Sequence, residues 1–352
     1  MSVGGLRTGV VVLVCTAWAQ AQQVCPNDPV IDQIRVLSTI NEGDQSRIVR
    51  WVGGEIEILE GGVDDNPLAS FNRFRLCLKA QYENQNNTPQ FRAALAKKTA
   101  ELAVDRIARG GGKGTVSHAL ARALVDMETA EAHAAFLAGL KSSEPVTRLL
   151  CARGLASIQD AIAAEEAKLA RTVDALRSAG EVESSPEVLS QFYLALSYPS
   201  KAVVVFDAFM AVFDIRLSHR RGPAVYVDRA EIDAFDFFRK KGVIESLAQP
   251  QKVELARRLA VFLRMDAERY TAEELSFEEM DAIERRLDGA EALLELLVGR
   301  GSGGDIRGEL RDGGHDRLEA VLQEAYRWVG HPTTQSGGPL NAAPWNVPIG
   351  AP

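Results

Sequence analysis

The 352-residue sequence predicts a mainly α-helical protein built as an α-α superhelix, or solenoid, of stacked helix pairs. Three observations support this fold class. From Asp28 onward, apolar residues recur at intervals of three and four, which is the period of an amphipathic helix. Short motifs return at offsets of 31 and 41 residues, a spacing that suits a two-helix repeat. Prolines stand at expected first helical turns, where their missing N–H costs nothing; these are Pro89, Pro145, Pro186 and Pro250.

Residues 1–21 are typical of a secretory signal peptide. Arg7 lies in a short polar start, an apolar run follows from Val10 to Ala19, and small residues suited to cleavage occur at 17–19 and 19–21. The apolar run is about half as long as the ~20 residues that a membrane span needs. We therefore expect cleavage, an extracytoplasmic (periplasmic or secreted) location, and no transmembrane segment after cleavage.

Three cysteines remain after the expected cleavage, an odd number in a compartment where thiols tend to be oxidised. Cys151 lies within an apolar helical pattern, where a free cysteine usually behaves as a small buried hydrophobic residue. This leaves Cys25 and Cys77 as the candidate disulfide pair.

The helices expected from apolar periodicity, in chain order, are 29–40, 67–84, 89–109, 115–126, 129–141, 145–157, 160–179, 186–197, 201–218, 229–241, 251–269, 277–298 and 315–329. The segment 251–265 carries two adjacent apolar stripes and is expected to be buried on two sides. Near residue 203 a β-branched run is assigned to a helix because Phe206, Phe209 and Phe213 continue the helical spacing.

The segment 48–59 fits two structures. Its β-branched residues on both sides of Gly53-Gly54 are typical of a short β-hairpin. A helix would place five apolar residues on one face, namely Ile48, Trp51, Val52, Ile56 and Leu59. Two glycines inside a helix would cost about 2 kcal/mol relative to alanine. The helix is narrowly favoured, and the hairpin stays open as the alternative.

The chain divides into an N-terminal helical segment at 22–87, helical repeats at 88–270, a C-terminal helical segment at 271–330 and a tail at 331–352. The tail is rich in Pro, Gly, Asn and Thr, a composition that favours disorder. We therefore expect the packed core to end near residue 330.

The clearest copy of the repeat spans 129–160. Its second helix carries five residues expected to hold the repeat together, which are Pro145, Arg148, Ala152, Leu155 and Ile158. This order resembles the second-helix pattern of HEAT repeats, and the resemblance covers roughly residues 90–265 with declining quality. It implies HEAT-like helix pairs that stack because one pair cannot bury both of its apolar faces, and a curved inner surface that binds a partner.

No motif predicts catalytic, cofactor-binding or metal-ligating residues. The glycine-rich segment 110–115 lacks the spacing of a phosphate loop, and the glycines at 299–304 follow a helix where a dinucleotide motif follows a strand. The five histidines are scattered without metal-site spacing. A formal net charge of −8 argues against nucleic acid as a partner.

One basic cluster runs against this acidic balance and is a candidate binding patch. Its residues are Arg216, His219, Arg220, Arg221, Arg239, Lys240 and Lys241. If they met on one surface, they would suit an acidic peptide or a polyanionic glycan. The alternative, which we favour, is that they end two helices where cations suit the carboxyl terminus.

These features together predict an exported helical-repeat scaffold that binds a protein or a cell-envelope component. The alternative is a secreted all-α enzyme acting on a cell-wall polymer or glycan. It would require a deep cleft with two converging carboxylates of unequal proton affinity. A third hypothesis is a structural envelope protein whose Trp345-bearing tail docks elsewhere.

Overall fold

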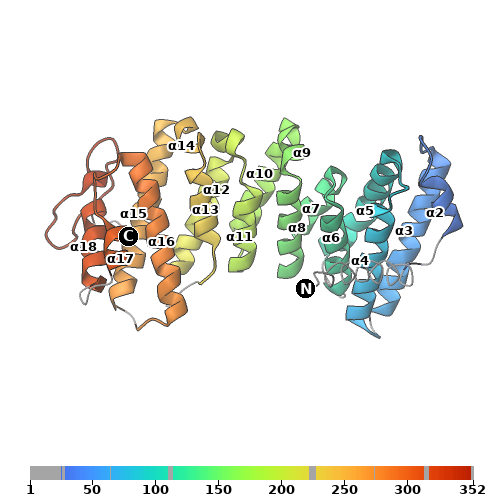
Figure 1. Ribbon diagram of the computed structural model, residues 1–352, viewed down its shortest axis with the longest axis horizontal. Helices are drawn as coiled ribbons and strands as arrows, with labels where there is room; N and C mark the ends of the chain where they lie inside the picture. Colours follow the sequence, from blue (N-terminus) through green and yellow to red (C-terminus); the bar gives the residue numbers. More distant parts are fainter. Residues whose placement is uncertain are drawn as a thin grey trace, which may run out of the picture. The chain divides into compact units, whose positions relative to one another are not determined.

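The computed structural model describes Cys25 and residues 28–63, 65–109, 114–221, 227–272, 274–312 and 317–349. Over these residues the regular structure is helical and contains no strand (Figure 1). The chain forms two compact units, Met1–Ala164 and Glu165–Pro352, each with its own core. The expected signal peptide lies outside the described residues. In the described part of the chain, no helix is both long and apolar enough to span a membrane.

The N-terminal unit consists of two rows of helices. Its elements are α2 (Pro29–Ile34), α3 (Glu42–Gly62), α4 (Pro67–Glu83), α5 (Pro89–Arg109), α6 (Gly114–Met127), η1 (Ala130–Ala132), α7 (His133–Gly139), α8 (Pro145–Ser157) and α9 (Gln159–Ala163). In one row α3 packs on α5 and α5 on α7, while in the other α4 packs on α6 and α6 on α8. Each helix therefore contacts the next-but-one helix along the chain, as expected when successive helix pairs stack.

The segment 48–59 lies within α3, so the hairpin alternative is wrong. A capping box at Asn41 and Asp44 starts this helix, and Ile48, Val52, Ile56 and Leu59 are buried. Packing of this buried face outweighs the cost of the two interior glycines.

Helix α8, which carries the repeat residues named above, packs closely on α7. Pro145 stands in the first turn, and Ala152 and Leu155 are fully buried. Arg148 Nη1 donates to the carbonyl oxygens of Ser142 and Ser143 at 2.8 and 3.0 Å, which fixes the turn before α8. The contact between α7 and α8 requires a glycine at 154, because an added Cβ would lie 2.4 Å from the ring of Phe136.

The C-terminal unit has the same alternating pattern. Its elements are α10 (Glu166–Gly180), α11 (Pro186–Ala195), η2 (Pro199–Lys201), α12 (Ala202–Arg220), α13 (Ala230–Arg239), α14 (Val243–Ser246), α15 (Gln249–Ala272), α16 (Phe277–Val298), α17 (Ile306–Asp312), α18 (Arg317–Val329) and η3 (Pro339–Asn341). One row runs α10, α12, α15 and α18, and the other runs α11, α13 and α16. The helix expected at 160–179 is two helices, because α9 ends at Ala163 and α10 begins at Glu166.

The tail was expected to be disordered, and for residues 331–349 this is wrong. Leu340 is fully buried, and Trp345 and Val347 are also buried. Asn341 Nδ2 donates to the carbonyl oxygens of Val329 and Val347, which ties the tail to the end of α18. Three apolar side chains in a polar segment are sufficient to anchor it on α15 and α18.

Candidate functional site

A groove of about 650 Å³ crosses the second helix row of the N-terminal unit. Three successive helices of that row, α4, α6 and α8, contribute its walls. The lining residues are Pro67, Leu68, Phe71 and Arg75 of α4, Thr115, His118 and Arg122 of α6, and Val146 and Leu150 of α8. Because it crosses consecutive helix pairs, this groove follows the direction in which the pairs stack.

The apolar part of the groove is open to solvent at both sides. Leu68 on α4 is 70% exposed and Val146 on α8 is 51% exposed. Large aliphatic side chains that border a depression together form the kind of exposed patch that marks an interaction site. The groove therefore offers two aliphatic contacts on opposite walls.

The charged part of the groove is basic. Arg75 and Arg122 both pair with Asp126, and the Arg122 Nε atom lies 3.0 Å from Oδ1 of that carboxylate. The carboxylate is nearly buried, whereas each arginine side chain is more than a quarter exposed. One carboxylate compensates two guanidinium groups, so this wall carries net positive charge although the chain as a whole is acidic.

His118 of α6 also lines the groove. Burial lowers the pKa of its imidazole, and the nearby Glu144 opposes that shift only in part. The ring is therefore neutral at pH 7. Its Nε2 atom is shielded from solvent and has no hydrogen-bond partner among the described residues. An occupant of the groove that supplied a carboxylate would favour the protonated ring.

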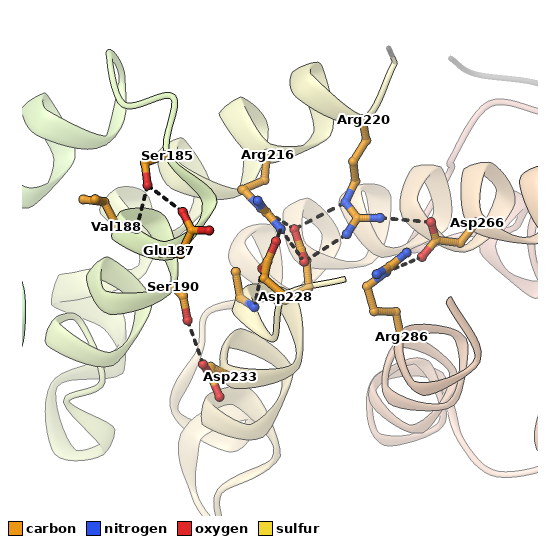
Figure 2. A network of polar contacts seen from close by, with 12 residues as sticks. Ser185, Glu187, Val188, Ser190, Arg216, Arg220, Asp228, Asp233, Asp266 and Arg286 are labelled. Atoms are coloured by element: carbon orange, nitrogen blue, oxygen red, sulfur yellow. Dashed lines mark hydrogen bonds and ion pairs between the residues drawn. The ribbon is translucent and has the colours of Figure 1, made fainter. Parts of the chain in front are cut away.

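The candidate basic patch does not form one surface, because two of its arginines are buried. Arg216 and Arg220, which are labelled in Figure 2, are 1% and 2% exposed. Both donate to the carboxylate of Glu231. The network continues from Arg220 Nη1 to Asp266, at 3.0 Å, and from Asp266 to the buried Arg286. These arginines join α12, α13, α15 and α16 inside the C-terminal unit and are not available to a ligand.

The rest of the patch is divided between two ends of α13. Helices α12 and α13 run antiparallel, since Arg216 pairs with Glu231 while Phe209 stacks on Phe237 at a ring distance of 4.6 Å. Arg239 therefore lies about 12 Å along α13 from Glu231. Arg239, Lys240 and Lys241 are exposed at that far end, and His219 and Arg221 stay at the end of α12. The seven residues do not converge.

Two carboxylates near the network differ in proton affinity, as the enzyme hypothesis requires. Burial raises the pKa of Asp233, which accepts a hydrogen bond from Ser190 Oγ at 3.0 Å. Glu187 has a lowered pKa because its own backbone N–H and the Ser185 hydroxyl stabilise the carboxylate. Both are drawn in Figure 2, and neither lines the groove described above. Among the described residues, no group of His, Cys, Asp and Glu side chains could hold a metal ion.

Cys25 and Cys77 form a disulfide in the structure, which is the pair that the sequence indicates. The Gln81 side chain on α4 lies beside this bridge and accepts a hydrogen bond from Arg35 Nη2 at 2.6 Å. Cys151 is a buried free thiol, and burial raises its pKa far above the ordinary value. The disulfide connects α4 to the chain segment before α2.

No family model, curated protein or solved structure matches this chain. The likeness to HEAT repeats therefore remains a prediction. The groove was not predicted from the sequence. Its signal was present on α4, where Leu68, Phe71 and Arg75 recur at helical spacing and form a face outside the buried stripe of Phe74 and Leu78.

Proposed function

We propose that this chain is an exported helical-repeat scaffold, and that the groove across α4, α6 and α8 binds a segment of a partner protein. The observation that carries the proposal is this groove of about 650 Å³, with aliphatic walls and uncompensated arginine charge. The alternating helix rows of each unit support the solenoid part of the proposal.

The partner segment that fits is amphipathic, with aliphatic and acidic side chains. Aliphatic groups would lie between Leu68 and Val146, which are exposed without a partner. A carboxylate would reach the wall formed by Arg75 and Arg122. Helix-in-groove recognition uses this combination of apolar anchors and flanking charge.

A random peptide library displayed on phage tests the proposal. Selection on the mature protein should enrich peptides that contain both aliphatic and acidic residues. A selected peptide, labelled for fluorescence anisotropy, should bind Leu68→Asp and Val146→Asp at least about tenfold more weakly, because burying one aliphatic side chain contributes about 1.5–3 kcal/mol.

Leu76→Asp is the matched control, because Leu76 is an exposed leucine of α4 that does not line the groove. Its peptide affinity should equal that of the wild type. Equal losses for Leu68→Asp and Leu76→Asp would refute the groove. A mature protein that hydrolysed a glycan panel and enriched no peptide would favour the enzyme alternative.

Export has its own test. The chain, expressed with residues 1–21 in a host with a secretory pathway, should leave the cytoplasm and begin after residue 19 or 21. N-terminal sequencing of the exported protein identifies the cleavage site. A cytoplasmic protein that keeps Arg7 would contradict export and leave the groove proposal untouched.

A further inference from the structure

Two glycines in the middle of α3 have no explanation in the fold of one chain. An added Cβ at Gly53 or Gly54 would meet no atom within 4 Å. This differs from Gly139 and Gly154, where a Cβ would clash with a neighbouring helix. Glycine destabilises a helix interior relative to alanine. A glycine in open space therefore lowers the stability of the helix without relieving any steric clash.

Gly54 lies in a second groove of the N-terminal unit, of about 470 Å³, between α2 and α3. Trp51 and Ile58 line this groove three residues before and four residues after the glycine, so all three share one helix face. Ile58 is 50% exposed, and Val30 of α2, which also lines the groove, is 42% exposed. The groove thus has apolar sides and a bare backbone at its centre.

The same face of α3 carries one unpaired charge of each sign. Arg50 and Glu57 are exposed, and neither has an ion-pair partner among the described residues. Glu55, the acidic residue of α3 that lines the groove, is already paired with Arg73 at 2.7 Å. Positive charge therefore precedes Gly54 along the helix, and negative charge follows it.

We propose that the groove receives α3 of a second copy of this chain, antiparallel to the first and related to it by a two-fold axis at Gly54. Arg50 lies about 6 Å before Gly54 along the helix and Glu57 about 4.5 Å after it. Reversal of the second helix brings Arg50 of one copy opposite Glu57 of the other. The same rotation brings Trp51 of one copy beside Ile58 of the other.

Under two-fold symmetry each of these contacts forms twice, so this face of α3 is complementary to itself in both charge and shape. The glycine then has a function, because helices approach closer than the usual 8–10 Å only where side chains at the contact are small. This interface is separate from the groove across α4, α6 and α8. The dimer proposal therefore does not depend on a partner binding in that groove.

Charge exchange tests the proposal directly. Sedimentation equilibrium of the mature chain should show a concentration-dependent dimer. Arg50→Glu and Glu57→Arg should each raise the dissociation constant at least about tenfold, because each places like charges opposite one another. The double variant, and an equimolar mixture of the two single variants, should dimerise again, since both restore opposite charges.

Gly54→Ala distinguishes the interface from a folding defect. It should raise the thermal midpoint of the monomer, because the site is open and alanine favours the helix, yet weaken the dimer about tenfold. Gly53→Ala is the matched control: it also meets open space but does not line the groove, so it should raise the midpoint and leave the dimer unchanged. A wild-type chain that stays monomeric at its highest soluble concentration overturns the proposal, as does a dimer that the charge reversals leave intact.

Discussion

Replacing Glu231 by glutamine should destabilise the C-terminal unit more than any other single substitution of one carboxylate by its amide. The Glu231 side chain is fully buried. Its two oxygens accept four hydrogen bonds, from Nε and Nη2 of Arg216 at 2.6 and 2.9 Å and from Nε and Nη2 of Arg220 at 3.3 and 3.0 Å. Glutamine keeps the shape of the side chain but removes the negative charge.

The expected loss follows from these four bonds. The amide oxygen of glutamine can accept two of them, and its NH₂ group would face two guanidinium donors. A hydrogen bond to a charged group contributes about 1.5–3 kcal/mol, so two lost bonds amount to about 3–6 kcal/mol. Breaking a buried ion pair costs about 3–5 kcal/mol, which agrees with that range. We therefore expect Glu231→Gln to lower the free energy of unfolding by about 4 kcal/mol.

Urea unfolding followed by circular dichroism measures this change, with Asp228→Asn as the matched control. Asp228 also bonds Arg216, but its side chain is 18% exposed, so water can replace part of the lost hydrogen bonding. We therefore expect Asp228→Asn to lower the free energy of unfolding by about 1 kcal/mol. Equal effects of the two substitutions, or a loss below about 1 kcal/mol for Glu231→Gln, would show that the network does not stabilise the fold.

The pH dependence should have a defined sign. Burial alone would raise the pKa of Glu231, but Arg220 and Arg216 outweigh it, and the pKa lies well below its ordinary value of 4.5. A carboxylate with a lowered native pKa contributes stability above its unfolded pKa and loses it as the pH falls. The stability difference between wild type and Glu231→Gln should therefore shrink progressively below about pH 4.5.

Three further predictions concern other sites. Replacing Cys25 and Cys77 by serine should lower the free energy of unfolding by about 4 kcal/mol in urea titrations, because the bridge closes a loop with a sequence separation of 52. Because burial lowers the native pKa of His118, the unfolded state binds more protons below about pH 6.5, so acidification should lower the melting temperature of the wild type more than that of His118→Gln. Gly303→Ala should cost about 3 kcal/mol in urea unfolding, since its Cβ would lie 2.2 Å from Trp328.

Periodicity and proline placement predict most of the helices. The bounds of α5, α8 and α16 agree with the sequence prediction to the residue, because proline or a serine cap marks the start of each. Local signals favoured a helix at α3 only narrowly, because two glycines also fitted a turn; burial of one helix face against neighbouring helices accounts for the observed helix.

The candidate sites were harder to predict, because they depend on contacts between residues distant in sequence. Arg220 looks like a surface charge until Asp266, 46 residues later, is brought beside it. The groove likewise needs α4, α6 and α8 to be adjacent, which no single amphipathic pattern specifies. The polar composition of the tail also led to a wrong prediction of disorder, because the buried side chains of Leu340 and Trp345 hold this otherwise polar segment against the fold.

The packing of that tail has a consequence for how copies of the molecule can assemble. In a stacked helical protein the last helix presents an apolar side on which another molecule could pile, and such stacking has no natural stopping point. Here η3 (Pro339–Asn341) packs on α15 and α18, and Leu340, Trp345 and Val347 of the tail are buried. A truncated chain ending at Gly330 would uncover that side, and light scattering should then detect filaments or aggregates that the intact chain does not form.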